Sequence, residues 1–63
     1  MTYTYQLDQI HRIEVQKHGE GDYREQYFEM MGGRWVALGP ETRWSSLIEI
    51  RYEYGLDSSM MVD

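Results

Sequence analysis

The chain has few residues whose types and spacing suit catalysis or metal binding. His11 and His18 are its only histidines and it contains no cysteine, so it offers no thiolate nucleophile, no disulfide and no cysteine-ligated zinc site. No HxH or HExxH spacing brings metal ligands together. His18 stands near Glu20 and Asp22, a set that would form only a weak, adventitious cation site. The sequence therefore predicts no metal and no cofactor.

Two other motifs carry chemical groups but are better explained by structure. Gly19-Glu20-Gly21 has the GxG spacing of phosphate-binding loops, yet it is expected between two strands, and its acidic neighbours would repel a phosphate. Ser45 and Ser46 have no histidine placed to activate them, and Ser46 suits a helix N-cap. A chain of 63 residues also has little volume for a substrate pocket. We therefore expect neither enzymatic activity nor a small-molecule substrate.

The charge balance argues against several classes of partner. Eleven acidic residues face six basic ones, which gives a net charge of −5. Duplex DNA, RNA backbones and anionic lipids attract basic surfaces, so a protein partner is expected instead. No apolar run reaches the ~18 residues of a membrane span, and the N-terminal residues lack the pattern of a signal peptide. These features predict a cytoplasmic chain that binds no membrane, with one small domain over residues 1–56 and a frayed tail over 57–63.

The elements that position the side chains are predicted from alternation. Residues 12–16 alternate apolar with polar, the period of a half-buried strand. Residues 23–31 and 34–38 are rich in aromatic and β-branched side chains, and Gly32-Gly33 between them signals a two-residue hairpin. The polar residues 17–22, which include two glycines, are expected to form the longer loop of a first hairpin. These stretches predict a three-stranded antiparallel meander. The N-terminal stretch alternates in the same way at Tyr3, Tyr5 and Leu7.

Two templates compete for the last element. Residues 48–54 alternate apolar with polar, which fits a further strand. Ser46 and Glu49 have the spacing of a capping box, and Gly55 stands where a helix takes its left-handed C′ residue. We favour the helix, because a three-stranded sheet needs a cover for its apolar face. The predicted fold class is α+β, a meander covered by a short C-terminal helix, and the alternative is an all-β fold of four or five short strands.

The strand register assigns side chains to the two faces of the sheet. We prefer the register that pairs Ile13 with Tyr27, because the opposite parity sets Glu14 against Glu25, and like charges in that position are destabilising. The predicted core consists of Ile13, Val15, Tyr27, Val36 and Leu38, covered by Leu47, Ile50 and Tyr54 and extended by Tyr3, Tyr5 and Leu7.

The same register leaves an aromatic set on the opposite face. The glycine turn pairs Met30 with Trp35, and Phe28 then shares their face. Aromatic residues, methionine and arginine framed by acids are typical of an interface core. The alternative is that the two faces are reversed and this set forms the core. The predicted partner-binding residues are Ile10, Arg12, Phe28, Met30 and Trp35.

These features favour a small acidic protein-interaction module that acts as a homodimer or as an inhibitor or accessory factor on a protein partner. Across residues 10–56, the meander followed by Trp44-Ser45-Ser46-Leu47 and a short helix resembles many small bacterial and phage proteins, which implies a phage or mobile-element origin. One alternative is a sheet that binds single-stranded nucleic acid through its aromatic residues. Another is an anionic mimic of nucleic acid.

Overall fold

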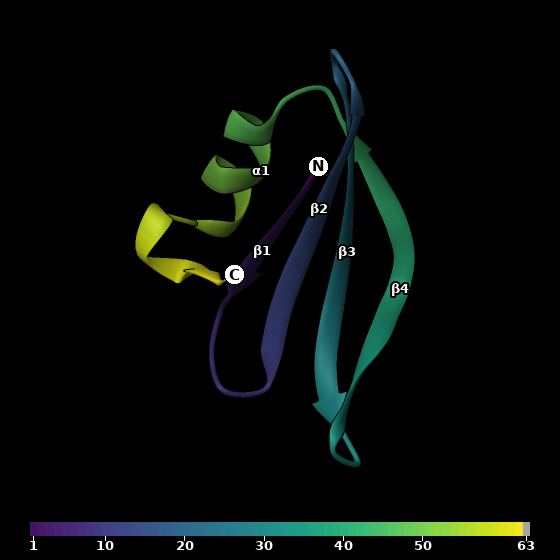
Figure 1. Cartoon of the computed structure of the whole chain (residues 1–63), viewed down its shortest axis with the longest axis vertical. Helices are drawn as coiled ribbons and strands as arrows, with labels where there is room; N and C mark the ends of the chain where they lie inside the picture. The colour runs from purple at the N-terminus through teal and green to yellow at the C-terminus, as the bar shows by residue number, and fades with distance from the viewer. Residues whose placement is uncertain (63) are drawn as a thin grey trace.

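The computed structural model describes residues 1–62. It is an antiparallel sheet of five strands, in the order β4-β3-β2-β1-β5, with one short helix packed on one face (Figure 1). The predicted antiparallel sheet with a C-terminal helix is confirmed, but the sheet has five strands where a meander of three was predicted. The elements in chain order are β1 (Thr2–Gln6), β2 (His11–Gly19), β3 (Asp22–Met31), β4 (Arg34–Trp44), α1 (Leu47–Tyr54), a 3₁₀ turn (Ser58–Met60) and β5 (Met61–Val62).

The register confirms the predicted assignment of faces. Ile13 on β2 lies opposite Tyr27 on β3 and opposite Tyr5 on β1, so all three side chains point toward the helix. Met30 lies opposite Trp35, as a two-residue turn requires. Gly32 and Gly33 have φ of 60° and 82°, the positive values that a type I′ turn needs at both positions.

A bulge interrupts β4 halfway along its length. Tyr27 pairs with Leu38 and Glu25 pairs with Thr42, so three residues of β4 oppose the single residue Gln26. The side chain of Gln26 donates to the carbonyl oxygen of Gly39 at 3.1 Å and so satisfies a backbone group of the bulge.

The end signals of α1 match those read from the sequence. The Ser46 hydroxyl accepts a hydrogen bond from the backbone N–H of Glu49 at 3.3 Å and also donates to the Glu49 carboxylate. Hydrogen bonds from Ser45 and Ser46 lower the pKa of Glu49. Gly55, at φ 64°, ends the helix, and the N–H of Leu56 bonds the carbonyl of Arg51 at 2.8 Å. The predicted helix is therefore confirmed over Leu47–Tyr54, and the alternative of a further strand over residues 48–54 is wrong.

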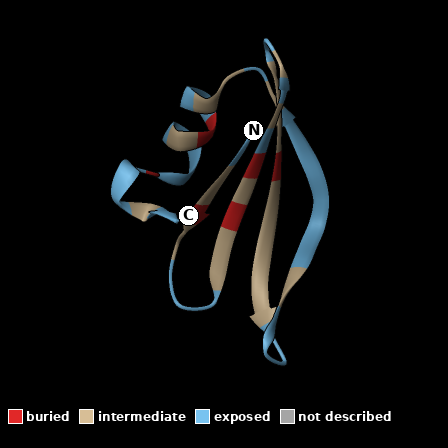
Figure 2. Ribbon diagram, in the orientation of Figure 1, coloured by how far each residue is buried: buried red, intermediate tan, exposed pale blue. Residues whose placement is uncertain are grey.

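The core lies between the helix and one half of the sheet (Figure 2). Tyr5, Ile13, Val15 and Ile50 are almost completely buried, and Leu56 after the helix joins them. The residues packed around this core are only partly buried: Tyr3, Leu7, Tyr23, Tyr27, Trp44, Leu47 and Met60.

The prediction that Val36 and Leu38 belong to the core is wrong. Both lie on the face that carries the helix, but Val36 is half-buried and Leu38 is 39% exposed, and neither packs against the core. The reason is length. An eight-residue helix spans about 12 Å, whereas β4 has eleven residues, each adding about 3.3 Å. The helix therefore leaves the turn-proximal part of β3 and β4 uncovered (Figure 1).

A buried carboxylate joins three elements at the helix-covered end. Glu25 on β3 is 3% exposed, and its Oε1 accepts hydrogen bonds from Trp44 Nε1 at 3.1 Å and from the Tyr54 hydroxyl at 3.0 Å. Burial, followed by the charge of Glu25, raises the pKa of Tyr54 to about 12. The hydroxyl therefore stays protonated and able to donate at neutral pH.

Residues 57–62, which follow the domain predicted over residues 1–56, include the 3₁₀ turn and the short strand β5. Asp57 caps the 3₁₀ turn by accepting from the N–H of Ser59 at 2.9 Å, and Met61 of β5 pairs with Tyr5. This short strand covers the outer edge of β1. Asp63 lies outside the described residues. Among residues 1–62, no helix is long and apolar enough to cross a membrane.

Candidate functional site

One face of the sheet is left open. The helix packs on the opposite face (Figure 1), and no element within residues 1–62 covers this one. The side chains on the open face are those that alternate with the core positions. Polar or charged members frame it, namely Gln6, Arg12, Glu14, Arg24, Gln26 and Arg43, and the apolar members are Phe28, Met30, Trp35 and Ala37.

Four of the five predicted partner-binding residues lie on this face, and Ile10 lies next to them in the loop between β1 and β2. We call the five residues the outer cluster: Ile10, Arg12, Phe28, Met30 and Trp35. Arg12 lies opposite Phe28, and Met30 lies opposite Trp35. The N–H of Met30 donates to the carbonyl of Ile10 at 2.7 Å. Ile10 is 48% exposed, whereas the other four side chains are half-buried. The cluster is therefore partly desolvated before any partner arrives.

Arg12 organises this cluster. Its guanidinium carbon stands 4.1 Å from the ring centroid of Trp35, so the side chain reaches from β2 across β3 to β4. Its Nη2 donates to Gln6 Oε1 at 2.8 Å, and its buried Nε has no hydrogen-bond partner. A cation over an indole contributes about 0.5–1 kcal/mol at an exposed site and more when desolvated. Gln6 was not predicted from the sequence as part of this site. Its position beside Arg12 depends on the pairing of β1 with β2, and the predicted meander of three strands did not include β1.

The remaining cations of the open face are neutralised by acids. Arg24 lies opposite Arg43, and Asp22 bridges them with N–O distances of 2.7 and 3.3 Å. Glu41 contacts Arg24 at 3.7 Å. The hydrogen bond that Arg24 donates to Asp22 lowers the pKa of the Asp22 carboxyl group. This end of the face is therefore a mixed-charge network and not a basic surface.

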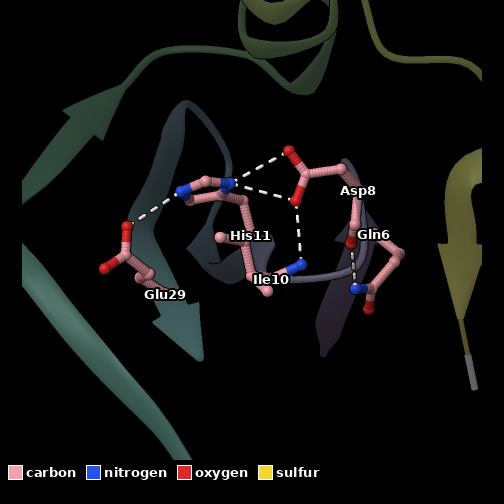
Figure 3. Close-up of polar contacts among 5 residues, drawn as sticks. All are labelled: Gln6, Asp8, Ile10, His11 and Glu29. Atoms are coloured by element: carbon pink, nitrogen blue, oxygen red, sulfur yellow. Dashed lines mark hydrogen bonds and ion pairs between the residues drawn. The ribbon is translucent and has the colours of Figure 1, made fainter. Parts of the chain in front are cut away.

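A histidine held by two carboxylates lies on the helix-bearing face, near the loop between β1 and β2 (Figure 3). His11 Nδ1 is 3.0 Å from both oxygens of Asp8, and Nε2 is 2.9 Å from Glu29 Oε1. The hydrogen bond to Asp8, then that to Glu29, raises the pKa of His11, and the same contact lowers the pKa of Asp8. Carboxylates only accept, so the doubly protonated imidazolium satisfies both contacts at once.

This arrangement does not suit a metal ion. The two carboxylates approach opposite nitrogens of the ring, so one cation cannot contact all three groups (Figure 3). Within residues 1–62, no group of three histidine, aspartate or glutamate side chains is placed to hold a metal. The contacts instead tie the β1–β2 loop to β3.

The His11 contacts predict a pH-dependent stability. Because its pKa is raised on folding, the contribution of His11 is complete below its ordinary value of 6.5 and is lost as the pH rises through the raised value. We expect the melting temperature of the wild type to fall relative to His11→Gln between pH 5.5 and pH 8.5. His18→Gln, at the only other histidine, should keep the wild-type dependence. Identical profiles for His11→Gln and the wild type would show that the contacts are not stabilising in solution.

The helix carries a second group of exposed apolar side chains. Ile48 and Tyr52, one turn apart, are 78% and 90% exposed. With Arg51, Gly55 and Leu56 they line an open hollow of about 540 Å³. Arg51 is its only charged side chain, and no set of polar groups converges there as a small-molecule site requires. We assign this hollow no ligand.

The fold and the open face define a class of protein: a small two-layer module whose sheet packs one face under a helix and presents an arginine–tryptophan cluster on the other. No family model, no curated protein and no solved structure matches the chain.

Proposed function

We propose that this chain is an acidic protein-interaction module that binds a protein partner through the outer cluster and acts on that partner as an inhibitor or accessory factor. The observation that carries the proposal is the contact of the Arg12 guanidinium with the Trp35 ring, on a sheet face that no other element within residues 1–62 covers. A phage or mobile-element origin and a cytoplasmic location remain predictions from the sequence.

The energetics favour such a contact. Full burial of a large apolar side chain contributes roughly 1.5–3 kcal/mol relative to full exposure, so completing the burial of Phe28, Met30 and Trp35, which are half-buried, contributes part of that amount for each. Tryptophan and arginine are the residues most enriched among interface hot spots. The Arg12 side chain is already held by Gln6 and Trp35, so less conformational entropy is lost on binding.

Binding of single-stranded nucleic acid is less well supported. A base would have to displace Arg12 from the Trp35 ring, and Arg24 and Arg43 are engaged by Asp22. A basic groove gives RNA affinity that falls steeply with salt, so a shallow slope in a salt titration separates the two functions. The mimic of nucleic acid has little support either, because cations and acids alternate on the open face.

Trp35→Ala tests the proposal. With the chain as bait in extracts of the cells that encode it, we expect a specific partner to be retained by the wild type and lost with Trp35→Ala. The variant should still fold, because Trp35 lies outside the core, and should lose about 1–2 kcal/mol of stability. Tyr52→Ala, at an exposed aromatic residue on the helix, is the matched control and should retain the partner. A partner lost with Tyr52→Ala and kept with Trp35→Ala would move the binding site to the helix.

A further inference from the structure

The edge of β4 is free for pairing. Within residues 1–62 the sheet order places β4 at one end, with β3 as its only neighbour, and the two-residue strand β5 at the other end. An edge strand presents unpaired N–H and C=O groups that can template pairing with another chain. The regular part of this edge begins after the Gly32-Gly33 turn and ends at the bulge that follows Leu38. The free window is Arg34–Leu38.

The hydrogen-bonding groups of this window are self-complementary. In a two-residue hairpin the pair that closes the turn, here Met31 and Arg34, exchanges both backbone hydrogen bonds, and the direction of the backbone groups then alternates along the strand. Trp35 and Ala37 therefore point their N–H and C=O groups away from β3. These two residues lie symmetrically about Val36.

We propose that a second copy of this chain pairs antiparallel with this edge, with the two-fold axis at Val36. Trp35 of each copy then lies opposite Ala37 of the other, and the two pairs exchange four backbone hydrogen bonds. The two Val36 side chains meet on the axis, and Arg34 lies opposite Leu38. The two sheets join into one continuous sheet. This inference concerns the backbone edge of β4, which shares only Trp35 with the outer cluster, and it goes beyond the proposed function.

The charges of the strand favour this partner and this direction. Arg34–Leu38 contains no acidic residue, in a chain that has eleven. Arg34 stands at the turn end of the window and has no ion-pair partner within residues 1–62, and Glu41 follows at the bulge end. Antiparallel pairing sets Arg34 of each copy opposite the uncharged Leu38 of the other, and Glu41, which already contacts Arg24, lies three positions further along. Parallel pairing in register would set Arg34 against itself.

The second copy would also cover apolar surface that the fold leaves exposed. Val36 and Leu38 lie on the helix-bearing face beyond the reach of α1. A standard dimer buries roughly 800 Å² per partner, about a fifth of the 4364 Å² surface of this chain. Edge pairing sets Val36 beside Val36 and Leu38 beside Arg34 of the second copy, so it removes part of this exposed apolar surface from water without using the helix.

The test is the oligomeric state of the full chain by light scattering and sedimentation across a wide concentration range. We expect the wild type to dimerise. Val36→Lys sets two ammonium groups against each other on the axis, where Cβ atoms of opposite residues lie ~4.5–5.5 Å apart, and should weaken the dimer at least about tenfold. Val36→Thr, β-branched and uncharged, should dimerise like the wild type. Circular dichroism checks that each variant is folded.

Hydrogen exchange provides a second readout that needs no variant. The amides of Trp35 and Ala37 should be protected at concentrations where the dimer forms and should exchange rapidly on dilution. A wild type that stays monomeric at every concentration, or a dimer that survives Val36→Lys while these amides exchange rapidly, would overturn the proposal. Ile10→Glu, in the outer cluster away from β4, should leave the dimer intact. A dimer lost with Ile10→Glu and kept with Val36→Lys would also overturn edge pairing, while leaving protein binding by the outer cluster in place.

Discussion

Replacing Ile50 with alanine is expected to lower the free energy of unfolding by about 3 kcal/mol, within the range of buried isoleucine-to-alanine changes. Ile50 is completely buried and packs between the helix and the sheet with Tyr5, Ile13 and Val15. A 63-residue chain has a total stability of only about 3–9 kcal/mol at the usual 0.05–0.15 kcal/mol per residue. Ile50→Ala should therefore remove at least about a third of the total stability, which urea denaturation followed by circular dichroism would measure.

Ile48 provides a control in the same helix. It is the same residue type, two positions away, and 78% exposed. Ile48→Ala should change stability by no more than about 0.5 kcal/mol, and alanine's better helix propensity partly offsets any loss. Equal effects at the two positions would contradict the packing of α1 described above, since they would mean that the helix does not bury one face against the sheet.

Replacing Glu25 with alanine is expected to cost about 3 kcal/mol. The change removes the acceptor of two hydrogen bonds, each worth roughly 1.5–3 kcal/mol when one partner is charged, and leaves Trp44 Nε1 and the Tyr54 hydroxyl without this partner. The attachment of α1 to β3 and β4 depends on these contacts. Thermal and urea unfolding measure the loss.

Two variants separate the hydrogen bonds from the volume of the side chain. Glu25→Gln keeps an acceptor oxygen and should cost less than Glu25→Ala. Tyr54→Phe removes one donor and should cost about 1.5 kcal/mol. In the double variant Glu25→Ala with Tyr54→Phe, the losses should be less than additive, because the same hydrogen bond is removed by each change. Strict additivity would show that Glu25 and Tyr54 do not interact in solution.

The two proposed contacts use surfaces that the core does not need. The outer cluster lies on the open face, and the free edge lies at the turn-proximal part of β4, beyond α1 (Figure 1). The buried residues lie at the helix-covered end (Figure 2). Substitutions at Trp35 or Val36 can therefore change binding without removing the core, whereas Ile50 and Glu25 affect every property through folding.

Local rules in the sequence were enough to predict several features. The capping signals at Ser46, Glu49 and Gly55 specify a helix through contacts within one turn, and they correctly outweighed the strand-like alternation of residues 48–54. The Gly32-Gly33 turn determined the pairing of β3 with β4, and with it the place of Trp35 on the open face. These predictions were correct because each depends on residues close together in the chain. The capping contacts lie within one turn of helix, and in the hairpin the turn fixes the register, which then determines the face on which each alternating side chain lies.

Only the tertiary structure decided which apolar residues of the correct face are buried. Val36 and Leu38 have the parity of core residues, but burial requires a covering element, and an eight-residue helix covers only one end of the sheet. The buried Glu25, the Gln6–Arg12–Trp35 contacts and the histidine between Asp8 and Glu29 each join residues from different strands or loops. Alternation predicts the side of the sheet on which a residue lies. It does not predict how far another element reaches over that side, because that depends on the lengths and packing of segments distant in the chain.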